Sequence, residues 1–129
     1  MTWYLDTSAF IKLVRSEPES SALGAEIATG DAIVSSALLV VEERRAAARY
    51  GPLALSRARA ALATITLLAL DDATLEMAAG LEPPELRSLD ALHLATAISL
   101  RGELGRFFCY DARLSAAAAQ AGLEVRQPA

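Results

Sequence analysis

The first residues of the chain constrain its fold more than any other stretch. The bulky segment Thr2–Leu5 runs into Asp6 and the hydroxyls of Thr7 and Ser8, and apolar residues recur at helical spacing from Ala9 onward. This pattern predicts a short buried strand that ends at a carboxylate, followed at once by a helix. In open α/β sheets, ligands bind just outside the carboxyl ends of the strands. Asp6 therefore marks the edge where a site is expected.

Short apolar segments alternate with helix-like segments along the rest of the chain. We predict further strands at residues 32–35, 64–70, 107–110 and 123–126. We predict helices at residues 9–14, 19–28, 37–49, 52–63, 73–77, 89–100 and 112–121. Ser36 and Ser88 are the expected caps of two of these helices, and Gly30-Asp31 is an expected turn. The alternation predicts a three-layer α/β/α sandwich around a short, mainly parallel sheet of about four to five strands.

The composition limits the class of protein. A chain of 129 residues is expected to form one domain over residues 1–129, and its single cysteine, Cys109, excludes an intrachain disulfide and fits a reducing cytosol. We expect a soluble cytoplasmic protein, because no secretory signal is visible and no apolar run approaches the roughly 18 residues of a membrane span. The net charge of −4 argues against a module that holds nucleic acid by charge alone. It does not exclude a nucleic-acid enzyme whose acids are neutralised by metal ions.

Three aspartates occupy positions where carboxylates perform chemistry. Asp6 and Asp111 each end an apolar strand and precede a helix, so they lie close together if their strands are neighbours. Asp90 stands near the start of an apolar helix, where a carboxylate needs a partner. Gathered carboxylates repel one another unless some are protonated or a cation joins them. Mg²⁺ or Mn²⁺ suits such a cluster and can activate water against a phosphodiester, whereas no Cys or His spacing suggests zinc.

Simpler interpretations exist for each of these acids. Asp6 and Asp111 are also good helix N-caps, and Asp90 is also a favourable charge in a first helical turn. A fourth acid comes from the helix at 37–49, where the adjacent Glu42 and Glu43 are not separated by helical periodicity. The residues alone leave these alternatives open.

Other polar residues have ordinary structural interpretations. His93 follows Asp90 by three positions and invites a general-base role, but we interpret it as a satisfied structural histidine. Cys109 is expected in the strand core. The remaining candidates are the expected cap residues Asp71 and Asp72, the turn residue Asp31, and the arginines Arg44, Arg45 and Arg49, which form a solvated face or contact RNA or a partner.

Four segments of the chain together resemble the PIN domain, and within it the VapC toxins of type II toxin–antitoxin systems. They are Tyr4–Ser8, Ser36–Glu42, Leu89–Ala97 and Tyr110–Leu114, and the string Asp90–Ala97 is the most specific of them. The resemblance implies an acidic quartet that holds Mg²⁺ or Mn²⁺ and supports hydrolysis of RNA. By this resemblance the quartet is Asp6, Glu42, Asp90 and Asp111, and Thr7 or Ser8 is the small hydroxyl that assists in the pocket.

The resemblance also implies partners, and it leaves rivals. It implies an endoribonuclease toxin that forms a homodimer and is blocked by a cognate VapB-type antitoxin, whose arginine would suit an acidic pocket. A haloacid-dehalogenase-like phosphatase requires a second aspartate two residues after the first, at the position of Ser8. A receiver domain requires a lysine late in the chain, and the single lysine here is Lys12. The alternative from a different class is a catalytically inactive PIN-like module that binds RNA or protein.

Overall fold

The computed structural model describes residues 1–30 and 32–129, and strands alternate with helices through most of this part of the chain. Its five strands are β1 (Thr2–Leu5), β2 (Ala32–Ser36), β3 (Thr66–Leu68), β4 (Leu104–Phe108) and β5 (Val125–Arg126). Its seven helices are α1 (Thr7–Val14), α2 (Ser20–Ile27), α3 (Leu39–Ala48), α4 (Pro52–Leu62), α5 (Asp72–Ala79), α6 (Ser88–Ile98) and α7 (Ala112–Gln120). The alternation predicted from the sequence is confirmed. The expected turn residue Asp31 lies outside the described residues.

The five strands form one parallel sheet in the order β3-β2-β1-β4-β5. The first strand of the chain is therefore the central strand of the sheet, between β2 and β4. In a parallel sheet all carboxyl ends lie at one edge, so the residues that follow β1 and β4 meet there. The strands before Asp6 and Asp111 are neighbours, which is the condition under which these two acids were expected to lie close together.

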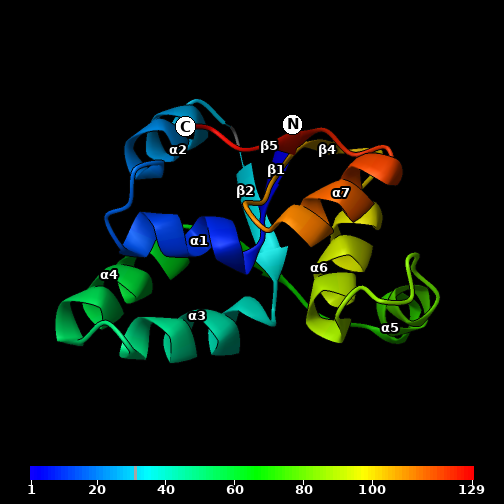
Figure 1. Cartoon of the computed structure of the whole chain (residues 1–129), viewed down its shortest axis with the longest axis horizontal. Helices are drawn as coiled ribbons and strands as arrows, with labels where there is room; N and C mark the ends of the chain where they lie inside the picture. Colours follow the sequence, from blue (N-terminus) through cyan, green and yellow to red (C-terminus); the bar gives the residue numbers. More distant parts are fainter. Residues whose placement is uncertain (31) are drawn as a thin grey trace.

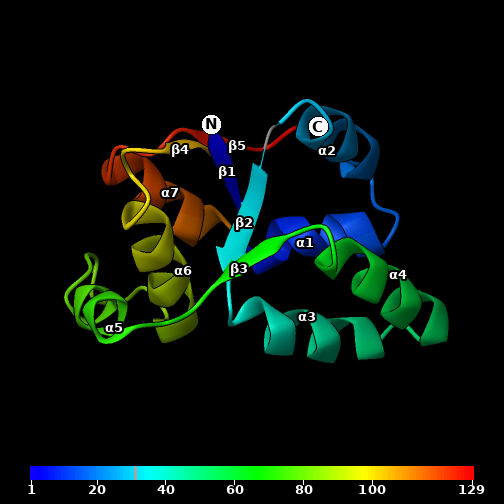
Figure 2. The same ribbon diagram turned by 180° about the vertical axis from the view of Figure 1, so that it is seen from behind.

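Helices cover both faces of this sheet, as the predicted three-layer architecture requires. In Figures 1 and 2, α1 to α4 lie on one side of the strands and α5 to α7 on the other. Alternate strand side chains supply the two cores: Tyr4 and Phe107 pack with α6 and α7, while Leu5 and Phe108 pack with α1 and α2. A further cluster around Phe10 joins α1, α3 and α4. No helix in the described residues is long and apolar enough to cross a membrane.

The largest departure from prediction concerns β4. The strand predicted at residues 107–110 instead covers Leu104–Phe108 and includes Gly105 and Arg106. Trp3 of the neighbouring strand explains the shift, because its ring packs over both residues. The Arg106 guanidinium carbon lies 4.6 Å from the centre of the Trp3 ring, and a Cβ on Gly105 would lie 2.9 Å from Trp3 Nε1. Packing against a residue about a hundred positions away thus extends the strand.

The helix ends differ from prediction in smaller ways. The prediction of Ser88 as a cap is wrong: it is the first residue of α6, and Arg87 precedes it without a capping side-chain bond. Ser36 ends β2, and its hydroxyl accepts a hydrogen bond from the Leu38 backbone N–H at 3.2 Å. Asp71 caps α5 as predicted. Gly122 follows α7 with a φ of +89°, a conformation that favours glycine, and so explains where that helix stops.

The two edge strands are shorter than predicted. The sequence suggested residues 64–70 and 123–126, whereas β3 covers Thr66–Leu68 and β5 covers Val125–Arg126. Each pairs with a single neighbour, so fewer of its residues take part in the ladder. Cys109, expected within β4, lies directly after it and is fully buried.

Candidate active site

The four acids expected at the site lie where helices begin at the carboxyl edge of the sheet. Asp6 directly follows β1, Asp111 lies three residues after the end of β4, and the two are the N-caps of α1 and α7. Glu42 and Asp90 lie in the first turns of α3 and α6. The cap interpretation of the two strand-end acids is confirmed, because each accepts a 2.9 Å hydrogen bond from the backbone N–H three residues on. Each cap engages one carboxylate oxygen, so capping and a role in a site are compatible.

Asp6 is the buried acid at the centre of this edge, with only 3% of its surface exposed. Its Oδ1 accepts hydrogen bonds from the Ser8 hydroxyl at 2.7 Å and from the Ala9 N–H at 2.9 Å. Its Oδ2 is 3.1 Å from the Cys109 thiol, a weak donor. Burial raises the pKa of Asp6 above its ordinary value, even though these bonds favour the charged form. Oδ2 is therefore the less satisfied oxygen, and a nearby cation would offset the burial.

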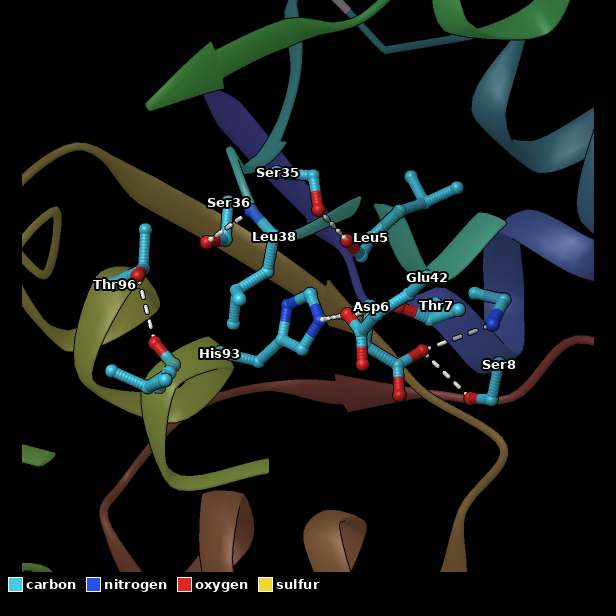
Figure 3. Close-up of polar contacts among 12 residues, drawn as sticks. Leu5, Asp6, Thr7, Ser8, Ser35, Ser36, Leu38, Glu42, His93 and Thr96 are labelled. Atoms are coloured by element: carbon cyan, nitrogen blue, oxygen red, sulfur yellow. Dashed lines mark hydrogen bonds and ion pairs between the residues drawn. The ribbon is translucent and has the colours of Figure 1, made fainter. Parts of the chain in front are cut away.

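Glu42 faces a histidine and a threonine rather than open solvent. Its Oε1 lies 2.7 Å from His93 Nε2 and accepts a 2.8 Å bond from the Thr7 hydroxyl (Figure 3). Burial opposes the charge, but the hydrogen bond from His93 outweighs it with help from Thr7, so the pKa of Glu42 lies below its ordinary value. Its neighbour Glu43 is buried on the face of α3 that carries Leu39, and burial raises its pKa. The structure thus separates the two glutamates.

His93 is buried and hydrogen-bonded through both ring nitrogens. It is 1% exposed, with Nδ1 2.7 Å from the Tyr4 hydroxyl and Nε2 shared between Glu42 and the Thr7 hydroxyl, the latter at 3.2 Å. This agrees with our interpretation of a satisfied histidine. In Figure 3 its ring points from α6 toward Glu42. The structural contacts of His93 therefore include one of the expected site residues.

An arginine that the sequence analysis missed joins the other two acids. Arg87 Nε lies 3.1 Å from Asp90 Oδ2, and its Nη2 lies 3.5 Å from Asp111 Oδ2. The arginine side chain is 67% exposed, so solvent screens these two ion pairs and another cation could replace the arginine. Glu42, Asp90 and Arg87 also line a pocket of about 240 Å³. The signal available in the sequence was the spacing of Arg87, three residues before Asp90.

The carboxylate and hydroxyl oxygens at this edge are suitable ligands for a hard cation, although three of the four acids contact Arg87 or His93 in the structure. Carboxylate and hydroxyl oxygens are the ligands that Mg²⁺ and Mn²⁺ prefer. Among the described residues, no three His, Cys, Asp or Glu side chains converge closely enough to hold a metal ion. Arg87 lies between two of the acids and His93 holds a third, which accounts for the separation. A metal ion would compete with Arg87 for Asp90 and Asp111.

The remaining polar candidates lie on the surface or serve as caps. Arg44, Arg45 and Arg49 are exposed along α3, as a solvated face requires, and Asp72 is the first residue of α5. Ser8 differs from Thr7 in its contacts: it donates to Asp6 and accepts the Tyr110 N–H at 2.9 Å, so it links two loops at the edge of the sheet. Both hydroxyls expected to assist are thus bonded to an acid.

Comparison with known proteins identifies the family of the chain. The family model of the PIN domain matches residues 3–120. The chain is 47% identical to Ribonuclease VapC46 and 39% identical to Ribonuclease VapC47, both of Mycobacterium tuberculosis, over 97% of this chain and 96% of each relative. A toxin–antitoxin complex from Klebsiella pneumoniae shares the fold, with a TM-score of 0.74 at 24% identity over 98% of this chain and 97% of that one. The chain belongs to the PIN-domain family and, within it, to the VapC group.

Proposed function

We propose that this protein is a metal-dependent endoribonuclease, the toxin of a VapBC-type toxin–antitoxin module, which hydrolyses RNA phosphodiesters. The observation that carries the proposal is the placement of four carboxylates at the carboxyl edge of the sheet, in a chain whose relatives are named ribonucleases. Parallel α/β sheets bind their ligands at this edge. The four acids are Asp6, Glu42, Asp90 and Asp111.

The acids divide the work of holding Mg²⁺ or Mn²⁺. Asp6 and Asp90 would be the principal ligands, and Glu42 and Asp111 would complete the site directly or through water. When bound, the ion supplies activation of a water molecule and stabilisation of the charge that develops on the phosphodiester. The raised pKa of Asp6 supports its role, because a carboxylate that burial destabilises gains most from an adjacent cation.

The chain's own polar groups orient these acids and the substrate. Ser8 holds Asp6 through Oδ1, and Thr7 holds Glu42 through Oε1. The second oxygen of Asp6 then has the Cys109 thiol, a weak donor, as its contact, and the second oxygen of Glu42 is not the atom that Thr7 and His93 contact. Arg87 contacts Asp90 and Asp111 at the rim of the pocket, and its exposed guanidinium would be free to contact a phosphate of the RNA if those acids held a metal ion.

A VapB-type antitoxin and a second copy of the chain are the proposed partners. The helix that carries Glu42, α3, also exposes Val41 at 60%. Its neighbour α4 exposes Leu53 at 63% and Leu55 at 39%. Such side chains suit an apolar segment of the antitoxin, with an arginine that reaches the acids. Light scattering of the purified chain tests the homodimer by its mass. A mass of one chain at micromolar concentration contradicts the dimer.

Cleavage of total RNA by the purified, partner-free chain tests the function. We expect discrete fragments with Mg²⁺ or Mn²⁺ and none with chelator. An Asp6→Asn variant that is folded by circular dichroism is expected to yield none. Equal cleavage by variant and parent would assign the activity to a contaminant. If neither cleaves and the parent binds no Mn²⁺ by calorimetry, the protein is the inactive PIN-like binding module.

A further inference from the structure

The geometry points to a positioning residue for this site: we propose that His93, held in place by Tyr4, orients Glu42 toward the metal ion. The inference rests on the proposed ribonuclease function, since Glu42 matters only if the acids hold a metal ion. Three residues from β1, α3 and α6 form the chain of contacts. Figure 3 shows its second half, the contact between His93 and Glu42. None of the contacts is local in sequence: the separations are 89 and 51 residues.

The direction of each hydrogen bond follows from the chemistry of the partners. An ionised carboxylate only accepts hydrogen bonds, so His93 Nε2 carries the hydrogen that bridges the 2.7 Å to Oε1 of Glu42. The Thr7 hydroxyl also donates to Oε1 and so acts as acceptor in its 3.2 Å contact with Nε2. Glu42 therefore receives two donors on one oxygen.

Tyr4 fixes the other side of the imidazole. Its hydroxyl lies 2.7 Å from Nδ1, and burial raises the pKa of Tyr4, so the phenol keeps its proton. The Tyr4 ring stacks on Phe107 at 5.3 Å between centroids and meets His93 edge-on at 5.8 Å. Since Tyr4 is 0% exposed and His93 1%, neither ring has room to turn away. Packing thus fixes the orientation of the imidazole, with Nε2 toward Glu42 and Nδ1 toward Tyr4.

The consequence for the site is a fixed direction for the free oxygen of Glu42. With Oε1 anchored by two donors, the Oε2 atom is the one left to contact a metal ion or its bound water. Partners that orient a metal ligand in this way commonly affect metal affinity or activity by about 10- to 100-fold when they are lost. The effect should therefore appear first in binding of Mn²⁺ alone, before any RNA is added.

Two substitutions of His93 separate positioning from simple packing. In His93→Gln the side-chain amide reaches the position of Nε2 and can donate to Glu42, whereas in His93→Asn the shorter amide reaches only the position of Nδ1 near Tyr4. We expect His93→Asn to weaken Mn²⁺ binding about 10- to 100-fold by calorimetry, and RNA cleavage in parallel. His93→Gln should recover most of both, and Asp71→Asn, on α5, should match the parent. Equal losses in two folded His93 variants, or no loss in His93→Asn, would overturn the proposal.

The chain has a single histidine, which allows a direct spectroscopic test. With ¹⁵N-labelled histidine, the ring nitrogens of His93 should show hydrogen on Nε2, and both signals should move in Glu42→Gln and in Tyr4→Phe but not in Asp71→Asn. Hydrogen found on Nδ1 alone, or signals unmoved by Glu42→Gln, would refute the arrangement. This readout needs neither metal nor RNA. Failure of the nuclease assay with the expected spectrum would therefore count against the proposed function and not against the Tyr4–His93–Glu42 contacts.

Discussion

Asp6 and Asp111 have the same local structure and opposite surroundings. Each follows a strand of one parallel pair, each caps the next helix, and each accepts a 2.9 Å bond from a backbone N–H. Asp6 is 3% exposed, whereas the side chain of Asp111 is 31% exposed. A strand–aspartate–helix motif therefore sets where a carboxylate stands, but the packing around it sets its electrostatic state.

The difference shows in the partners that each acid has. Asp6 is held by uncharged donors from Ser8, Ala9 and Cys109, and its pKa is raised because burial outweighs them. Asp111 meets the exposed guanidinium of Arg87 at 3.5 Å. A nearby cation would therefore stabilise the charge of Asp6, whereas Asp111 already contacts Arg87, which a metal ion could replace. Four predictions test this contrast.

The largest expected effect is on cleavage of RNA. Asp6→Asn should lower the rate at saturating Mg²⁺ by more than about 100-fold, because a direct metal ligand contributes several kcal/mol and each 1.36 kcal/mol is tenfold. Asp111→Asn should lower it about 10-fold, since solvent can replace part of a peripheral acid. Single-turnover cleavage of a defined RNA measures both. Equal losses would mean that burial does not distinguish the two acids.

The same two variants should also differ in stability, and Asp6→Asn, which loses activity, should gain stability. At pH 7, Asp6→Asn should raise the free energy of unfolding by about 1 kcal/mol, because it keeps the cap but removes a charge that burial disfavours. Asp111→Asn should change it by less than about 0.5 kcal/mol. Urea denaturation without metal gives both values. A destabilised Asp6→Asn would show that the buried charge is favourable after all.

The gain from Asp6→Asn should depend on pH. The folded pKa of Asp6 is raised above its ordinary 3.8, so its folded state holds the proton more tightly than its unfolded state. Below about pH 3.8 Asp6 is protonated in both the folded and the unfolded parent, so its burial does not lower the free energy of unfolding. As the pH rises from there through the folded pKa, the free energy of unfolding of the parent falls by at most about 1.4 kcal/mol per pH unit. The difference in unfolding free energy between variant and parent, measured from pH 4 to 7, should grow. A constant difference would refute the raised pKa.

The smallest expected effect comes from Arg87→Gln. Removal of this exposed cation should strengthen Mn²⁺ binding by about 2- to 5-fold, since surface ion pairs contribute about 0–1 kcal/mol. Arg57→Gln, an exposed arginine on α4, is the matched control and should leave binding unchanged. Calorimetry at low ionic strength measures both. Weaker binding in Arg87→Gln would mean that the arginine does not compete with the metal ion.

Local sequence predicted the order of the elements and the places of Asp6 and Asp111, because strand and cap signals lie within a few neighbouring residues. It did not predict the start of β4, which depends on Trp3 packing over Gly105 and Arg106. Nor did periodicity choose Glu42 over its neighbour, a distinction that depends on contacts from other elements. What was missed is thus long-range packing.

Arg87 was missed for a related reason. Its pairing with Asp90 spans three residues and could be suspected from spacing, but its contact with Asp111 spans 24 and depends on how α6 and α7 meet. The interpretation of His93 as a satisfied structural histidine agrees with its burial and hydrogen bonds, but it did not identify the partners. Its partners, Tyr4 on one side and Glu42 on the other, come from elements that no local pattern joins.

The central place of β1 has a consequence for how the chain matures during synthesis. β1 leaves the ribosome before both of its neighbours and must wait for β2 on one side and for β4, some hundred residues later, on the other; Thr2 pairs with both Ala32 and Leu104. Non-local pairings of this kind are slow to form. Asp6 and Asp111 come together only once this pairing is made. A nascent chain that ends before Leu104 therefore has its first acid but neither the closed sheet nor the opposing acid.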